Sequence, residues 1–236
     1  MLTAPIQSGI VSIERVAWAL YFEGRACPTS VLMPPVLILW SCAIISCGSE
    51  VDMSVEPVVT VADLEAMPDD NNRYEVIDGE LLMSKSPGVP HQAVSMNLSY
   101  LFSKYLDLNP QGRVFAATGI ILSDIDAVIP DLVFIQRERL PEVIDGDRIV
   151  AAPDLVIEIL SPGPDNRRRD RVVKRQLYAK FGVKEYWIID LENKLVEAFV
   201  LKDRSLDSCA NLGLNDTIRS TVLTGFEAPV SAIFSL

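Results

Sequence analysis

The stretch PDLVIEILSP, residues 153–162, decides how this sequence is interpreted. Its apolar residues and closing proline predict a buried β-strand over 153–160. Glu158 interrupts the apolar run, and burying a carboxylate without a partner is costly. Glu158 therefore needs a partner from another part of the fold. An arginine of the following helix is the simplest structural alternative to a functional partner.

Asp154 shares a face of this strand with Glu158, because side chains alternate along a strand. The two residues lie about 13 Å apart along the strand, too far to bind one ion. The letters PDLV recur at 130–133, and Asp131 from that second strand can lie within a few ångströms of Glu158 if the strands are neighbours. An aspartate that follows proline at the start of a strand can also simply cap a turn, for Asp131 as for Asp154.

Two half-buried carboxylates repel each other unless a proton or a cation lies between them. Carboxylate oxygens favour Mg²⁺ or Mn²⁺. Such an ion can polarise a phosphodiester and lower the pKa of an attacking water. Asp131 and Glu158 are therefore the predicted metal ligands.

A basic helix is predicted over 166–182, ending at Gly182. Arginines near a helix N-terminus oppose the helix dipole, and a phosphate ligand would offset that cost. The predicted nucleic-acid contacts are Arg167, Arg168, Arg169 and Arg171. A solvated helix face paired with acidic neighbours is the structural alternative. Lys174 follows Val173 of the buried stripe, so its ammonium can reach the carboxylates.

The other elements follow the same α/β pattern. We expect a hairpin over 74–83 with Asp78-Gly79 as its turn, an amphipathic helix over 91–107 and strands over 113–123 and 127–136. A second hairpin (185–190 with 194–201), a C-terminal strand and a short helix complete the chain. The order predicts an α/β domain around one sheet.

Composition restricts the classes of function. The 236 residues carry a formal net charge of −11, which argues against a broadly basic nucleic-acid-binding surface but not against a local patch. The four cysteines match no zinc ligand set, and the body holds one thiol, which suits the cytoplasm. Residues 1–52 form an apolar leader. Its longest apolar run is too short to span a membrane. These residues are expected to be translated upstream sequence or poorly ordered, with a membrane anchor as the alternative, and the domain occupies 53–236.

Several motifs together resemble the Uma-two family, bacterial domains described as "putative restriction endonucleases" within the PD-(D/E)xK nuclease superfamily. They are RYEVIDGELLM (73–83), SPGVPHQ (86–92), VIPDLVFI (128–135), APDLVIEILSP (152–162), RRRDRVVKRQLYAKFGVKEYWIID (167–190) and LTGFEAPVSAIF (223–234). The resemblance implies a restriction-endonuclease-like α/β core, a central mixed β-sheet flanked by helices. It also implies a cytoplasmic, metal-dependent nuclease acting on DNA, and it leaves a homodimer open.

The resemblance assigns the metal ligands to Asp131 and Glu158. The superfamily lysine normally lies two residues after the glutamate, where this chain has Leu160. In the nearer family the following helix supplies it, which here implies Lys174. Glu80 is a weaker candidate as a further ligand, and His91 as a substrate contact or general base. The displaced lysine and the net charge leave a non-catalytic binding or regulatory module with the same fold as the alternative function.

Overall fold

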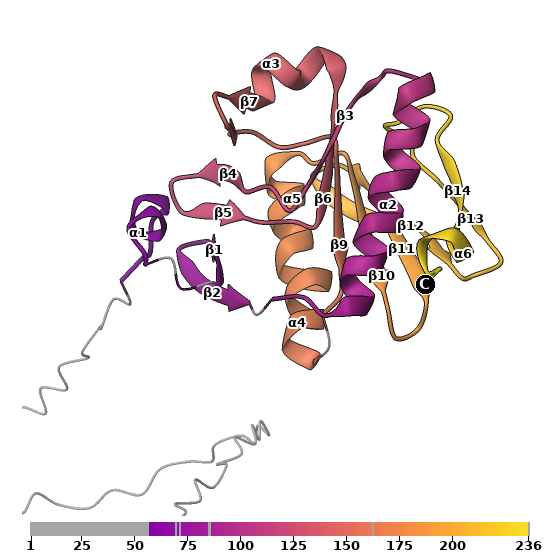
Figure 1. Ribbon diagram of the computed structural model, residues 1–236. Helices are drawn as coiled ribbons and strands as arrows, with labels where there is room; N and C mark the ends of the chain where they lie inside the picture. The colour runs from indigo at the N-terminus through magenta and orange to yellow at the C-terminus, as the bar shows by residue number, and fades with distance from the viewer. Residues whose placement is uncertain (1–56, 69, 71, 85, 162, 236) are drawn as a thin grey trace, which may run out of the picture. The chain divides into compact units, whose positions relative to one another are not determined.

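A computed structural model describes residues 57–68, 70, 72–84, 86–161 and 163–235, in which strands form two six-stranded sheets (Figure 1). The prediction for residues 1–52 lies outside the described part of the chain. Residues Ser54–Leu236 form one compact unit. No helix within the described residues is long and apolar enough to cross a membrane.

The central sheet has the strand order β12-β11-β10-β9-β6-β3. Strands β9 and β10 run parallel to each other. All other neighbouring strands of this sheet are antiparallel, so the sheet is mixed as predicted. Its strands are β3 (Gly112–Ala116), β6 (Leu132–Gln136), β9 (Leu155–Ile159), β10 (Glu185–Asp190), β11 (Leu195–Lys202) and β12 (Ser205–Leu212).

The second sheet has the order β2-β1-β5-β4-β8-β7. It consists of β1 (Arg73–Ile77), β2 (Glu80–Ser84), β4 (Ile120–Ser123), β5 (Asp126–Val128), β7 (Ile144–Asp145) and β8 (Arg148–Ile149). A two-stranded sheet of β13 (Thr217–Arg219) and β14 (Glu227–Pro229) lies near the C-terminus.

Helices cover both faces of the central sheet (Figure 1). The long helix α2 (Val89–Leu108) lies on one face. The other face is covered by a continuous helix in three segments, α4 (Pro164–Arg168), η2 (Arg169–Lys174) and α5 (Arg175–Phe181). Shorter helical segments are α1 (Val61–Glu65), η1 (Arg137–Arg139), α3 (Leu140–Val143) and α6 (Val230–Ile233).

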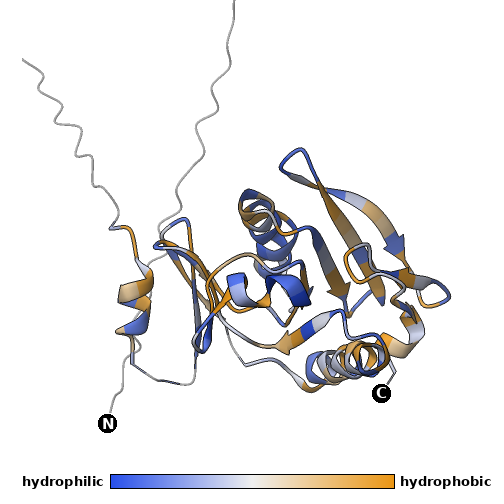
Figure 2. Cartoon of the chain, turned by 90° about the horizontal axis from the view of Figure 1, so that it is seen from above, coloured by the Kyte–Doolittle hydropathy of each residue, from blue (hydrophilic) through white to orange (hydrophobic). Residues whose placement is uncertain are grey.

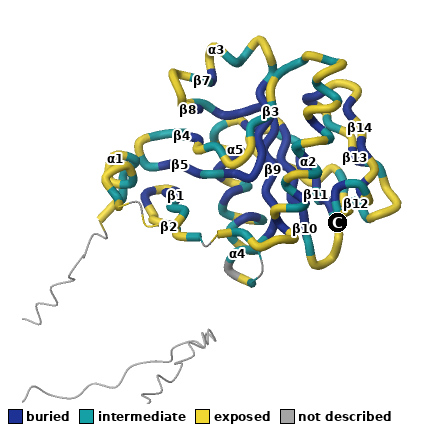
Figure 3. The backbone as a smooth tube through the Cα atoms, in the orientation of Figure 1, coloured by how far each residue is buried: buried dark blue, intermediate teal, exposed yellow. Residues whose placement is uncertain are grey.

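Strand alternation divides the apolar residues between two cores. Leu155, Ile157 and Ile159 of β9 pack in the cluster that contains α2, whereas Val156 packs in the cluster that contains α5. Figure 3 shows β9 and β10 as the buried centre, and in Figure 2 the strand ribbons are mostly hydrophobic while exposed turns are hydrophilic. Asp154 and Glu158 have the parity of Val156, so they lie on the α5 side of the sheet.

The prediction of a single sheet was wrong. The runs 113–123 and 127–136 each break into two strands that belong to different sheets. The first break lies at Ala117, which adopts a left-handed φ of 51°, and its N–H donates to the carbonyl of Asp131 at 2.9 Å. The second lies at Pro130 and Asp131, so Asp131 stands where the chain passes from one sheet to the other.

Candidate active site

Asp131 and Glu158 are brought together by the pairing of β6 with β9. The antiparallel register pairs Leu132 with Ile157, and continuing it by one residue places Asp131 opposite Glu158. Asp131 Oδ2 accepts a hydrogen bond from the backbone N–H of Ile159 at 2.8 Å. Both carboxylates are buried, with exposed fractions of 8% and 4%. The predicted proximity of the two repeated PDLV strands is confirmed.

Lys174 reaches this carboxylate pair from the helix. Its Nζ lies 2.9 Å from Glu158 Oε1 and 2.8 Å from Glu75 Oε1, and the side chain is almost fully buried. Leu160 lies buried in the α5-side core, as the strand pattern predicts. An ammonium from position 174 therefore lies beside Glu158, where position 160 offers only an apolar side chain.

Two further groups fix this arrangement. The hydroxyl of Tyr178 donates to Glu158 Oε1 at 2.7 Å, and the backbone N–H of Ile129 donates to Glu75 Oε1 at 2.7 Å. Burial keeps the pKa of the Tyr178 phenol well above its usual value, so this group acts as a donor. Glu158 is therefore held by an ammonium and a phenol at the same oxygen.

His91 and Arg73 approach Asp131 from the opposite direction. His91 Nε2 lies 3.3 Å from Asp131 Oδ2, and Arg73 Nη1 lies 4.0 Å from Oδ1. His91 is in the first turn of α2 and is 7% exposed. Its Nδ1 is buried and has no hydrogen-bond partner among the described residues.

A π-helical turn places the helix side chains. Segment η2 spans Arg169–Lys174, and π-turns are frequent at functional sites. In this wider turn residues four and five apart share a face, so Arg169 and Asp170 both lie beside Lys174. The hydroxyl of Tyr186 donates to the backbone carbonyl of Asp170 at 3.0 Å, which satisfies a backbone acceptor in the turn.

The electrostatics of the cluster follow from burial. Desolvation, reinforced by Asp170, Asp131 and Glu75, raises the pKa of Glu158 to about 8 even though Lys174 opposes it. Lys174 is also desolvated, but Glu158 and Glu75 raise the pKa of its ammonium above the usual value. Lys174 lowers the pKa of Glu75 despite that residue's burial. The lysine thus stays charged beside one ionised and one readily protonated carboxyl.

The cluster surrounds a small cavity of about 30 Å³. Asp131 Oδ1 and Glu158 Oε2 accept no hydrogen bond from any described residue. Oxygen donors of this kind fit Mg²⁺ or Mn²⁺. No group of three or more His, Cys, Asp or Glu side chains in the described ranges is placed to hold an ion. Two carboxylates would be the protein's share of such a shell, with water and substrate oxygens completing it.

The structure separates the other predicted residues from the cluster. Glu80, the first residue of β2, is exposed and lines a different pocket. Asp154 is structural, because it accepts from the backbone N–H of Gln136 at 2.8 Å and pairs with Arg139 at 3.0 Å.

Three of the four predicted arginines have an acidic partner. Arg171 is 2.8 Å from Asp190, Arg167 pairs with Glu192, and Arg169 Nε lies 3.2 Å from Asp170. Arg168 makes no ion pair with a described residue. The predicted phosphate contacts of the four arginines stay a prediction.

Glu75 is not among the site residues that the sequence predicted. It is 3% exposed and belongs to the cluster through Lys174. The signal was present, because Glu75 interrupts an apolar strand between Tyr74 and Val76 as Glu158 does in β9. Tyr178 and Asp170 were also not foreseen, since nothing local marks a tyrosine or an aspartate of a helix as a site residue.

One solved structure shares this fold. The chain is similar to a crystal structure from Anabaena variabilis described as "a putative nuclease belonging to DUF820". The TM-score is 0.62 at 17% identity, over 75% of this chain and 97% of that chain. The type IIG restriction endonuclease BpuSI gives a TM-score of 0.36 at 11% identity, over 61% of this chain and 15% of that one. No curated protein matches the sequence.

The sequence also matches a family model. The model is described as "Putative restriction endonuclease", and the match covers residues 61–231, most of the chain. That range includes every residue of the cluster, from Arg73 to Tyr178. The protein belongs to the Uma2 family and has a restriction-endonuclease-like nuclease fold.

Proposed function

We propose that this protein is a Mg²⁺- or Mn²⁺-dependent endonuclease that hydrolyses phosphodiester bonds of DNA. The observation that carries the proposal is the buried Lys174 ammonium, 2.9 Å from Glu158 on the side of the sheet where Asp131 stands opposite. A carboxylate pair and an ammonium from separate elements, brought to one small cavity, form a site rather than a simple ion pair. A nucleic-acid substrate and the single described thiol, Cys209, favour a cytoplasmic location.

In this proposal Asp131 and Glu158 hold the ion through Oδ1 and Oε2, the oxygens that accept no hydrogen bond from a described residue. The ion, when bound, supplies charge stabilisation for the phosphate and a more acidic water. Lys174 adds positive charge beside the reacting phosphate and, through Glu158, keeps the carboxylate in place. His91 orients a water or a substrate oxygen through Nδ1, the buried atom without a described partner. Arg168 and Arg169 contact the phosphates that flank the cut.

Cleavage of plasmid and of short single-stranded and duplex DNA, with Mn²⁺ or with EDTA, tests the function. The wild-type protein should cut only with the ion, and Asp131→Asn should not cut. Asp147→Asn is the matched control, because the Asp147 side chain is 99% exposed. Equal activity of Asp131→Asn and the control would reject the assignment.

A non-catalytic nucleic-acid-binding or regulatory module is the second candidate. It is favoured by the position of Lys174, whose ammonium lies between Glu75 and Glu158 and already neutralises the cavity. Titration with Mn²⁺, followed by the electron paramagnetic resonance signal of the free ion, separates the two functions. A nuclease binds Mn²⁺ in the wild-type protein and loses that site in Asp131→Asn. An inert module shows no difference between the two.

A further inference from the structure

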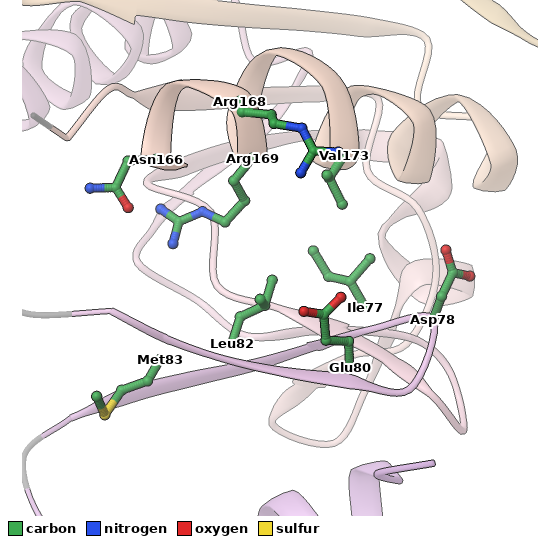
Figure 4. Close-up of a pocket in the computed structure, with 9 residues that line it drawn as sticks. All are labelled: Ile77, Asp78, Glu80, Leu82, Met83, Asn166, Arg168, Arg169 and Val173. Atoms are coloured by element: carbon green, nitrogen blue, oxygen red, sulfur yellow. The ribbon is translucent and has the colours of Figure 1, made fainter. Parts of the chain in front are cut away.

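A second, larger pocket lies next to the carboxylate cluster, between the β1–β2 hairpin and the helix α4–η2 (Figure 4). Its volume is about 430 Å³, within the range of small-ligand sites. In Figure 4, Arg168, Arg169 and Val173 extend from the helix toward the hairpin. Ile77, Leu82 and Glu80 extend from the hairpin toward the helix. The two walls therefore present both charged and apolar groups to the same space.

Arg169 connects this pocket to the candidate active site. Its side chain lines the larger pocket and also the small cavity that contains Glu158 and Lys174. A group held in the larger pocket would thus be adjacent to a phosphate bound at the carboxylates. Arg169 is therefore a wall that the two cavities share.

Positively and negatively charged side chains line opposite walls of the pocket. Arg168 has no ion-pair partner within the described part of the chain, so its guanidinium can bind an anion. On the hairpin side Asp78 is neutralised by Lys180 at 2.7 Å. Glu80 is exposed and makes no ion pair with a described residue. The pocket therefore offers cations on the helix wall and one free carboxylate on the hairpin wall.

The apolar part of the lining suits a flat ring. Met83 also borders the pocket, but its side chain alternates with Leu82 along β2 and points away from the helix in Figure 4. Leu82, Ile77 and Val173 are the other apolar side chains of the lining. A nucleotide of adenine, cytosine or guanine has three groups that fit this lining. It has a phosphate, a flat apolar ring and an amino group that can donate to a carboxylate. Thymine has no exocyclic amino group.

We propose that this pocket binds one unpaired nucleotide next to the scissile phosphate, and that its base carries an exocyclic amino group. The phosphate lies at Arg168 and Arg169, the base lies against Leu82 and Ile77, and the amino group donates to Glu80. A base inside a duplex cannot enter a pocket between a hairpin and a helix. The substrate strand must therefore be single-stranded or have its base extruded at this position. This inference rests on the proposed nuclease function and specifies its substrate.

The test measures binding without metal, so that no cleavage occurs. Fluorescence polarisation compares short single-stranded oligonucleotides of cytosine and of thymine with a duplex of the same length, all in EDTA. The wild-type protein should bind cytosine at least about fivefold more tightly than thymine, and the duplex more weakly than cytosine. Glu80→Gln should abolish the cytosine preference, because an amide can also donate to thymine. Glu142→Gln, an exposed carboxylate elsewhere, should keep it.

Arg168→Ala should weaken binding of both single strands by roughly tenfold, whereas Arg113→Ala on β3 should leave binding unchanged. Equal affinity for cytosine and thymine in the wild-type protein would overturn the proposal, as would a preference that survives Glu80→Gln. A competition experiment with free dCMP is the second part of the test. Binding of dCMP that the cytosine oligonucleotide cannot displace would assign the pocket to a free nucleotide instead of the substrate.

The two proposals fail separately. If the protein binds cytosine selectively but never cuts, the nuclease function is wrong and the base-binding pocket stands. If Asp131→Asn abolishes cleavage but no base preference exists, the nuclease function stands and the pocket assignment is wrong.

Discussion

At the scale of single residues, two opposing effects set the pKa of the Glu158 carboxyl group: burial raises it and Lys174 lowers it. Desolvation raises its pKa from an ordinary 4.5 to about 8. The folded state therefore binds a proton more tightly than the unfolded chain. The stability that this proton contributes is fully present below pH 4.5 and is lost as the pH rises through about 8.

Glu158→Gln should remove this pH dependence, because glutamine keeps the shape of the protonated acid. Relative to the variant, the wild-type protein should lose a few kcal/mol of unfolding free energy between pH 4.5 and about 8. Urea denaturation at several pH values measures the difference. Parallel curves for the two proteins across that range would contradict the raised pKa. The low pKa of Glu75 does not interfere, since its contribution changes only below its ordinary value of 4.5.

Lys174→Met should destabilise the fold, because it leaves the ionised, buried Glu75 carboxylate without its cation. We expect a loss of about 3–5 kcal/mol near neutral pH, diminishing in acid as Glu75 becomes protonated. Lys104→Met on the exposed side of α2 is the control and should change stability by less than about 0.5 kcal/mol. Adding Glu75→Gln to Lys174→Met should restore part of the loss, because it removes the uncompensated buried charge. No restoration would mean that the two side chains do not share one site.

At the scale of secondary-structure elements, the β1–β2 hairpin links the two pockets, since it carries Glu75 on one strand and Glu80 on the other. Its turn residue Gly79 has φ +79°, and a Cβ there would lie 2.4 Å from Val58 Cγ1. Gly146 has φ +59° with open space around it, so the same substitution meets strain but no clash.

Gly79→Ala should therefore cost more than Gly146→Ala, where backbone strain alone amounts to roughly 1 kcal/mol. Thermal unfolding of both variants measures the difference, and Val58→Ala combined with Gly79→Ala should remove most of it. Equal effects of the two glycine substitutions would show that Val58 does not restrict the turn. The larger loss should be accompanied by lower cleavage activity, because the hairpin positions Glu75.

Much of the site could be predicted at this scale, and the limits have physical reasons. The pairing of Asp131 with Glu158 and the approach of Lys174 followed from strand alternation and the helical stripe, which are local patterns. The π-turn did not, because one of its backbone carbonyls, that of Asp170, accepts from Tyr186 of β10, a contact between residues that are not neighbours in sequence. The runs 113–123 and 127–136 were read as single strands because an apolar pattern does not reveal when its partner strand changes.

At the scale of the whole molecule, the compact unit and the family match begin within a few residues of each other. The unit comprises Ser54–Leu236, and the match covers 61–231. We therefore expect a protein that starts at Met53 to unfold at the same temperature as the full chain and to cut nucleic acid at the same rate. A lower melting temperature or a lower rate for the shorter protein would show that residues 1–52 contribute to the domain. A homodimer stays a prediction, which light scattering of the same two proteins tests.

The net charge of −11 also belongs to this scale. A strongly acidic protein repels nucleic acid at long range, so binding must depend on local cations such as Arg168 and Arg169. This favours a substrate strand that enters a specific pocket over one that lies across a broad basic surface. A negative overall charge is thus compatible with nucleic-acid binding at the pocket that Arg168 and Arg169 line.

The most direct test of the central claim is the initial rate of Mn²⁺-dependent cleavage by the wild-type protein, Glu158→Gln and Glu142→Gln. The Asp131–Glu158–Lys174 cluster predicts cleavage by the wild-type protein and by Glu142→Gln. It predicts a rate lower by about a hundredfold or more for Glu158→Gln, which should remain folded. Cleavage by Glu158→Gln at the wild-type rate, or no cleavage by any of the three, would contradict the account.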